Sequence, residues 1–285
     1  GNEKSRLHFE FELEENTQGK KDLPGLDLLQ LESEISGLIK PWKTQLRELL
    51  CIQHPGEEGT QLYEHYVPLM PSHYRARVEA VEALENIQYL ELLTDEEKIQ
   101  FDLKPFTLPS PLVGSVSLLY IYSKEKIHLI RIMPVLQKLG LHVIDQLTTR
   151  IGNDEKTLGF IQSFRVSRND GIKIDEVRYK PLLDAIVQHV FQHKTENDPL
   201  NGLALLANLG WREINVLQLY RNLSLQLSAP LTRETINAVL LRHPQCSRVL
   251  FETFACRFSL DPSFGNLVYR KEVLLPQKNQ EFFEC

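Results

Sequence analysis

The order of hydrophobic patterns between residues 115 and 195 constrains the fold more than any other feature of the chain. The expected elements are a strand, a helix, two strands and a helix, over residues 115–122, 127–139, 141–151, 158–167 and 175–195. The first strand alternates, with one face richer in apolar groups, and Gly140 provides a natural stop for the first helix. This β-α-β-β-α order predicts an α+β fold, most of a ferredoxin-like unit flanked by helical segments.

The chain divides into three expected regions, with boundaries that follow changes in pattern. Residues 1–103 begin with an alternating strand over 6–14, continue with a long helix over 23–51 that Pro41 is expected to kink, and then add shorter helices. The strand and the long helix are interpreted as the end of an earlier β-α unit. The α+β region is expected over 104–197, where the proline-rich stretch 104–114 reads as an extended linker or edge segment. Residues 198–285 are expected to form a helical region with an irregular tail after residue 260.

Composition and termini limit the classes of protein to which the chain can belong. The net charge of −6 and the lack of a basic stripe argue against nucleic-acid binding. We expect no membrane span, because no apolar run reaches about 18 residues. Four widely spaced cysteines without a CxxC pair favour a reducing cytoplasm over a zinc site or a disulfide framework. The opening Gly1-Asn2, without methionine or signal peptide, indicates a fragment of a longer protein.

Motifs for chemistry are absent from the sequence. It contains no GxGxxG, Walker A, GxSxG or HExxH pattern, so we expect no catalytic, cofactor-binding or metal-binding residue. His189 and His193 have the i,i+4 spacing of some zinc sites, but no third ligand is evident and ordinary surface histidines are favoured. A row of glutamates on strand 6–14 similarly favours a solvated face over a cation site.

One helix start stands out as a candidate contact between domains. Trp211, Arg212 and Glu213 open the helix expected over 211–227, and Arg221 follows within it. The two arginines are candidates to pair with carboxylates of another domain. Ordinary capping and core packing remain the simpler interpretation of these four residues.

Several blocks resemble one enzyme family. Residues 139–146 resemble the second-strand signature of ACT-type regulatory domains, and a wider set is similar to the large bacterial NAD-specific glutamate dehydrogenases, in the region before their catalytic domain. The blocks that carry this resemblance are residues 134–146, Asn208-Leu209-Gly210-Trp211-Arg212-Glu213 with Leu217, Tyr220 and Arg221, Leu240-Leu241-Arg242-His243-Pro244, Phe251-Glu252 and Arg257-Phe258. Their order and spacing match, and weaker similarity covers nearly the whole chain.

The resemblance implies a parent enzyme that oxidises L-glutamate with NAD and water to 2-oxoglutarate, ammonia and NADH. The nicotinamide-binding unit and the catalytic lysine and aspartate of that family would lie beyond residue 285. This chain is therefore expected to be a non-catalytic regulatory or scaffolding fragment, which binds no NAD itself and contacts the catalytic domain of the same polypeptide in a cytoplasmic homo-oligomer. The alternative is a stand-alone ACT-type module that senses an amino acid.

Effector binding in ACT domains commonly uses the first strand-to-helix loop, often with a glycine or an acidic residue. Here the loop is Ser123-Lys124-Glu125-Lys126, without glycine, so the sequence favours packing over ligand binding. Side-by-side pairing of such sheets, within a chain or between subunits, would bury their edge strands. If a pocket for an amino-acid effector exists, its expected residues are Ser123, Lys124, His128, His142 and Asp145.

Overall fold

A four-stranded antiparallel sheet forms the centre of the molecule. The computed structural model describes residues 41–94, 98–106, 116–227, 230–260 and 265–285. The strand predicted over 6–14, with its glutamates, and the first part of the helix predicted over 23–51 lie outside these residues. The strand order is β1-β2-β4-β3, with bounds β1 Ile99–Phe106, β2 Val116–Ser123, β3 Leu141–Gly152 and β4 Thr157–Arg168.

The predicted β-α-β-β-α unit is confirmed, and its sheet is completed by a strand that precedes it. The helices of this unit are α6 (Leu129–Lys138) and α7 (Glu176–Phe191). In a ferredoxin-like unit the last strand pairs with the first, but here β1 occupies that position, antiparallel to β2 from Ile99 opposite Ser123 to Phe106 opposite Val116. The stretch 104–114 was expected to be a linker or edge segment, and its first residues, 104–106, are the end of this edge strand. The expected boundary between residues 103 and 104 lies inside β1.

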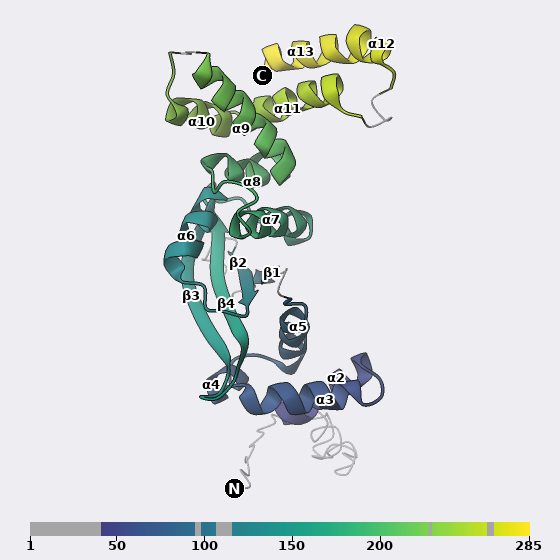
Figure 1. The fold of residues 1–285 in the computed structure, drawn as a ribbon, viewed down its shortest axis with the longest axis vertical. Coiled ribbons are helices and arrows are strands. Elements are labelled where there is room, and N and C mark those ends of the chain that lie inside the picture. Colours follow the sequence, from purple (N-terminus) through teal and green to yellow (C-terminus); the bar gives the residue numbers. More distant parts are fainter. Residues whose placement is uncertain (1–40, 95–97, 107–115, 228–229, 261–264) are drawn as a thin grey trace, which may run out of the picture.

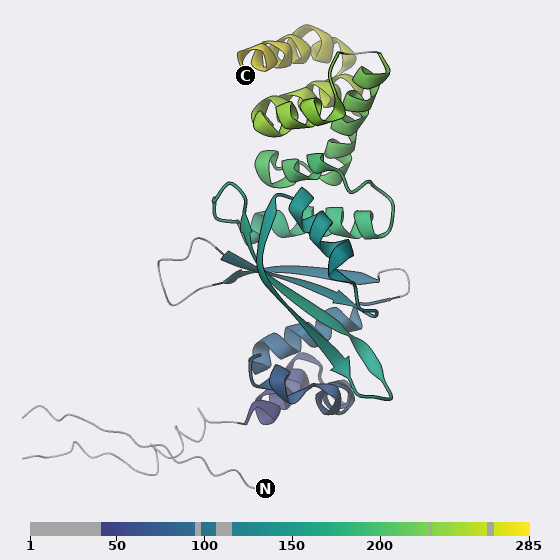
Figure 2. The ribbon, with the colours of Figure 1, turned by 90° about the vertical axis from the view of Figure 1, so that its left-hand side faces the viewer.

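Helices pack on both faces of the sheet, so β2 is buried on both sides (Figures 1 and 2). On one face, Leu119 and Ile121 of β2 join a core formed with α6, α7 and the helices that follow. On the other face, Tyr120 and Tyr122 join a second core with α5 (Ala80–Glu91) and the N-terminal helices. The alternation in β2 therefore separates two cores rather than a core from solvent.

The spacing of apolar residues predicts that Ile130 of α6 and Val81 of α5 face inward, but the structure exposes both. In α6, Ile132, Val135 and Leu136 are buried, whereas Ile130 is 82% exposed. In α5 the buried side includes Leu84, Ile87 and Leu90, as the spacing indicates, but Val81 is 56% exposed. Ile130 and Val81 both lie outside the buried stripe of their helices, which is set by the sheet rather than by the helix alone.

Short helices form the N-terminal part of the described chain. Pro41 is the N-cap residue of α2, so the part of the expected long helix that the structure describes begins directly after this proline. The other members of this group are α3 and α4, joined by the 3-10 turn η1. The bounds are α2 Trp42–Gln53, α3 Glu58–Tyr66, η1 Val67–Leu69 and α4 Ser72–Arg75.

A stack of helices continues from α7 to the end of the chain (Figure 1). Its local signals are clear in the sequence: Thr232 accepts a hydrogen bond from the Thr235 amide at 3.2 Å, and Glu213 accepts one from the Gly210 amide at 2.6 Å. Within the described residues no helix has the length and apolar character needed to cross a membrane. The elements are η2 Pro199–Gly202, α8 Leu203–Ala207, α9 Trp211–Gln226, α10 Arg233–Arg242, α11 Pro244–Phe258, α12 Leu267–Tyr269, the π-helical turn η4 Arg270–Leu274 and α13 Leu275–Glu284.

Candidate functional site

A cavity of about 340 Å³ lies where β2 ends and the chain turns toward α6. We call it the β2–α6 pocket. Two of the predicted effector residues, Ser123 and Lys124, line it. The lining is completed by residues that precede or begin β1, by the β2–α6 loop and by one side chain each of α6 and α7: Thr94, Lys98, Ile99, Glu125, Ile127, Arg131 and Phe191.

The charges of the β2–α6 pocket suit an anionic group. Among the described residues, Lys98, Lys124 and Arg131 contribute three cations to the lining, and Glu125 contributes one carboxylate. The guanidinium carbon of Arg131 lies 5.8 Å from the centroid of the Phe191 ring, which fixes that cation at the wall. The amide groups at the start of α6 add a partial positive charge, since a helix N-terminus favours anions.

The polar residues of the β2–α6 loop have different roles. Ser123 is buried, and its hydroxyl donates to the Glu125 carbonyl at 2.7 Å, so this side chain shapes the loop. His128 is the exposed N-cap residue of α6, and its carbonyl accepts from the Arg131 amide at 2.9 Å. Lys124 is exposed.

The other two predicted effector residues lie toward the opposite end of the sheet. The register aligns Ser123 with Phe160 and Arg150, five residues along β3 from Asp145. This separation corresponds to about 17 Å of strand, and His142 lies farther still. The five residues therefore do not form one pocket, although Ser123 and Lys124 do share one.

Asp145 forms an ion pair across the β3–β4 ladder. Its carboxylate accepts from Arg165 Nε at 2.7 Å and also from the other arm of the same guanidinium. The hydrogen bond from Arg165 lowers the pKa of Asp145, so the pair stays charged at neutral pH. Asp145 therefore has a structural partner on the neighbouring strand.

The Trp211 helix start is packed within the chain. The Trp211 ring stacks on His189 at a centroid distance of 4.1 Å, and the Arg212 guanidinium carbon lies 5.1 Å from the Trp211 ring centroid. Helix α7 ends at Phe191 and His193 has φ 56°, so the i,i+4 pair of histidines does not share a helical face. Within the described residues no group of three or more His, Cys, Asp and Glu is arranged to hold a metal ion.

Arg221 forms a buried charge pair. Its side chain is fully buried, and Nη1 donates to the two carboxylate oxygens of Asp198 at 2.9 and 2.7 Å and to Asn237 Oδ1 at 2.8 Å. Asp198 also accepts from the Leu200 amide at 2.9 Å. The predicted pairing of Arg221 with a carboxylate therefore occurs, but within the helical region of the same chain.

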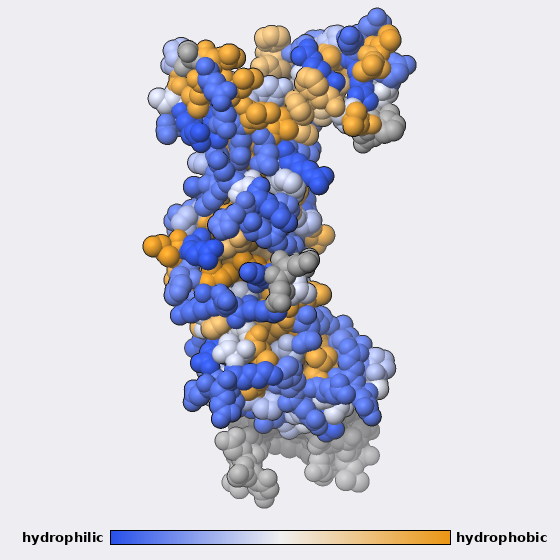
Figure 3. Space-filling view, in the orientation of Figure 1, coloured by the Kyte–Doolittle hydropathy of each residue, from blue (hydrophilic) through white to orange (hydrophobic). Residues whose placement is uncertain are grey.

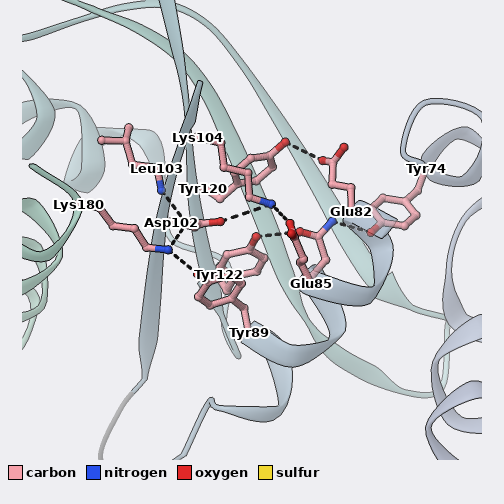
Figure 4. Close-up of polar contacts among 11 residues, drawn as sticks. Tyr74, Glu82, Glu85, Tyr89, Asp102, Leu103, Lys104, Tyr120, Tyr122 and Lys180 are labelled. Atoms are coloured by element: carbon pink, nitrogen blue, oxygen red, sulfur yellow. Dashed lines mark hydrogen bonds and ion pairs between the residues drawn. The ribbon is translucent and has the colours of Figure 1, made fainter. Parts of the chain in front are cut away.

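A second polar cluster surrounds Asp102 on β1, which sequence reasoning did not identify (Figure 4). Asp102 is 2% exposed and lies between two lysines, with Lys180 Nζ at 2.6 Å and Lys104 Nζ at 3.4 Å. Lys104 also contacts Glu85 of α5. Burial lowers the pKa of Lys180, but its hydrogen bonds to Asp102 and Tyr89 outweigh this and raise it overall. Both lysines are thus already neutralised by carboxylates of the chain.

Tyrosines extend this cluster across the sheet toward α5. Tyr122 donates to Asn86, which donates to Tyr74, while Tyr120 donates to Glu82, each at 2.7 Å. Burial raises the pKa of Tyr74, Tyr120 and Tyr122, so these hydroxyls stay protonated at neutral pH. The network stabilises the packing of α5 on the sheet. A cavity of about 560 Å³ adjoins it, but the β2–α6 pocket has the excess of cations.

Comparisons with known proteins agree with this architecture. Residues 114–178 match the family described as glutamate dehydrogenase, ACT3 domain, and residues 195–260 match glutamate dehydrogenase, helical motif 3. The NAD-specific glutamate dehydrogenase of Pseudomonas aeruginosa is 24% identical over 239 residues, which cover 82% of this chain and 14% of that protein. The chain fits a segment of a large NAD-specific glutamate dehydrogenase.

Two further relatives carry the same name. That of Halomonas elongata is 25% identical over 239 residues, covering 83% of this chain and 14% of the relative, and that of Mycobacterium tuberculosis is 23% identical over 248 residues, covering 85% and 15%. The chain thus spans about one seventh of the length of these relatives. The family resemblance and the ACT-like fold that the sequence indicated are both confirmed.

Proposed function

We propose that the chain is a non-catalytic regulatory and scaffolding segment of an NAD-dependent glutamate dehydrogenase. The parent reaction would convert L-glutamate, NAD and water to 2-oxoglutarate, ammonia and NADH, in the cytoplasm. The observation that carries this proposal is the match of the sheet region to an ACT3 domain and of the following helices to helical motif 3 of glutamate dehydrogenase. NAD would bind elsewhere in the parent enzyme.

The two edges of the sheet support a scaffolding role. At the β1 edge the Leu103 amide donates to the Asp102 carboxylate at 2.9 Å, and Pro105 has no amide hydrogen, so two potential donors are removed from pairing. The β3 edge is longer, and among the described residues no further strand pairs with it. It exposes Ile144 and Leu147, at 45% and 40%. We therefore favour β3 for side-by-side pairing, within the polypeptide or in a homo-oligomer.

The helical region offers a second contact surface. Apolar side chains lie on the outside of its helices, visible as orange patches in Figure 3. We propose that this surface faces the catalytic domain of the same polypeptide. The most exposed of these residues are Leu219, Leu227, Leu260, Leu267, Val268 and Phe283.

The β2–α6 pocket supports an effector role for the same segment. Three cations and a helix N-terminus around about 340 Å³ suit the carboxylate of a small amino acid. The same feature favours the alternative, a stand-alone amino-acid sensor. The two functions differ at the helical surface. A segment of a dehydrogenase would use this surface to contact a catalytic domain, whereas a stand-alone sensor would not require such a partner.

The test is calorimetric titration of the purified chain with the common amino acids and 2-oxoglutarate. We expect one of them to bind, with affinity reduced at least about tenfold by Lys124→Gln or Arg131→Gln, since each removes a charged contact of about 1.5–3 kcal/mol. Lys126→Gln is the matched control, because Lys126 is an exposed neighbour that does not line the pocket. Heat from none of these ligands would refute effector binding and leave scaffolding alone. Reduction of NAD with glutamate by the chain alone would refute the non-catalytic assignment.

A further inference from the structure

Another cavity lies where the stack of helices meets the end of the sheet, beside the last residues of α6 (Figure 1). We call this cavity of about 470 Å³ the junction pocket. Its walls come from the end of α6, the turn after β4, η2, α8 and α10, so the sheet region and the helical region both contribute to it. Among the described residues it shares no lining residue with the β2–α6 pocket, which lies at the start of α6.

Much of the wall of the junction pocket is apolar. Leu139 and Leu205 are buried, at 0% and 2% exposure, whereas Leu206 and Leu241 reach the surface in part. Leu139 belongs to the sheet region, at the C-cap of α6, and the other three leucines belong to α8 and α10. A cavity of this volume, with an apolar wall and a place between two packed regions, is typical of a site for a small molecule.

The two regions pack closely beside the junction pocket. A Cβ at Gly202 of η2 would lie 3.3 Å from the Lys138 carbonyl oxygen and 3.4 Å from Leu241 Cδ2, so any larger residue would crowd this approach. Lys138 Nζ also donates to the Asn197 carbonyl at 2.5 Å, which ties the end of α6 to the segment before η2. The cavity is therefore bounded by direct contacts between the sheet region and the helical region.

The charged residues of the junction pocket leave one cation uncompensated among the described residues. Arg168 is neutralised by Asp170, whose carboxylate accepts from Arg168 Nε at 2.9 Å and from Nη2 at 2.5 Å. Lys138 is half-buried, and its ammonium group contacts only a neutral carbonyl. The Gly140 carbonyl accepts from the Asn169 amide at 3.0 Å, so this acceptor at the end of α6 is already satisfied. An apolar wall with one positive charge at its rim suits an anion that has an apolar body.

We propose that the junction pocket binds a small monocarboxylate with an apolar chain of about four to eight carbon atoms. The chain lies against the four leucines of the wall, and the carboxylate meets Lys138 at the rim. Such a ligand contacts the sheet region and the helical region at once, so its binding stabilises their junction. An amino acid fits less well, because Asp170, a carboxylate of the lining that could accept its ammonium group, is already paired with Arg168.

The experiment is an NMR titration of the 285-residue chain, isotope-labelled at its leucine methyl groups, with hexanoate. Hexanol, which has the same chain without the charge, is the comparison ligand. We expect shifts concentrated at the four leucines of the wall, and hexanoate should bind about three- to tenfold more tightly than hexanol. Lys138→Gln should remove this difference by weakening the binding of hexanoate alone. Lys173→Gln is the matched control, because Lys173 is exposed and does not line the pocket.

A second variant tests the location of the site. Leu206→Trp should fill the cavity and weaken the binding of both ligands, and it is expected to fold because Leu206 is 36% exposed. Leu219→Trp, at a 61% exposed position of α9, should leave binding unchanged.

Three results would overturn the proposal. They are the absence of any shift, shifts spread over exposed leucines such as Leu219 and Leu227, and equal affinity of the wild type for hexanoate and hexanol. The first two would show that the cavity is not a binding site, and the third that Lys138 does not recognise the carboxylate. None of them bears on the effector role of the β2–α6 pocket, which is tested with other ligands and other variants.

Discussion

The buried pair of Arg221 and Asp198 gives the strongest prediction about stability. Both side chains are almost completely removed from solvent, at 0% and 4% exposure. The pair joins α9 to the η2 turn, and Asn237 connects it to α10. Asp198→Asn leaves the guanidinium charge buried without its counter-ion, while an asparagine side chain can still accept from the Leu200 amide.

The expected magnitude follows from the loss of a buried counter-ion. Removing one partner of such a pair costs about 3–5 kcal/mol, so Asp198→Asn or Arg221→Met should raise the unfolding equilibrium constant of the helical region roughly a hundred- to several-thousand-fold. The double variant removes both charges. It should lose about 2–3 kcal/mol less than the sum of the single variants.

The assay is urea unfolding followed by the fluorescence of Trp211, in a background in which Trp42→Phe removes the other tryptophan. Trp211 lies at the start of α9, on the helix that carries Arg221. The matched control is Arg248→Met, since Arg248 is 40% exposed in its ion pair with Glu252 and should contribute less than about 1 kcal/mol. If Arg221→Met costs no more than Arg248→Met, the buried pair does not stabilise the region as argued.

Two further predictions concern the sheet and the N-terminal helices. The pKa of Lys180 is raised from its ordinary value of 10.5, so the stability from its contact with Asp102 is complete below pH 10.5 and is lost as the pH rises above that value. In thermal melts between pH 7 and 11.5, the melting temperature of the wild type should exceed that of Lys180→Met by a constant amount up to pH 10.5 and by less above it. A difference in melting temperature that stays unchanged above pH 10.5 would contradict this. Gly59→Ala should destabilise α2 and α3 by about 1–3 kcal/mol, because a Cβ there would lie 2.6 Å from the Leu50 carbonyl oxygen. Trp42 fluorescence during urea unfolding measures this loss. A variant more stable than the wild type would contradict the prediction, because it would show that α2 and α3 move apart easily to accept the added methyl group.

The predictable parts of the fold are those with local signals. The β-α-β-β-α order and the helix starts at Asp175, Trp211 and Thr232 follow from periodicity and capping residues close in sequence. Helix faces were predicted less well, as the exposed Ile130 and Val81 show. Their burial depends on the angle at which each helix crosses the sheet, which no local pattern encodes.

Strand β1 was not recognised because its signal is weak within its own sequence. Pro105 and the prolines that follow favour a linker, and the residues become a strand only by pairing with β2. Asp102 was not identified for the same reason, since a lone acid two residues before a lysine is typical of a protein surface. Only the approach of α7 and α5 to the edge of the sheet gives it Lys180 on one side and, through Lys104, Glu85 on the other.

The features of the candidate site also fall into two groups: those that the sequence identified and those that only the tertiary structure brought together. The sequence by itself determined the ACT-like order of elements, the family resemblance and the loop that carries Ser123 and Lys124, because these depend on residues near one another in the chain. Tertiary structure alone decided that His142 and Asp145 lie away from that loop, since strand register sets their level in the sheet. It also joined Lys98 and Arg131 to the β2–α6 pocket. Such contacts span tens of residues and form only when whole elements pack, so local periodicity cannot specify them.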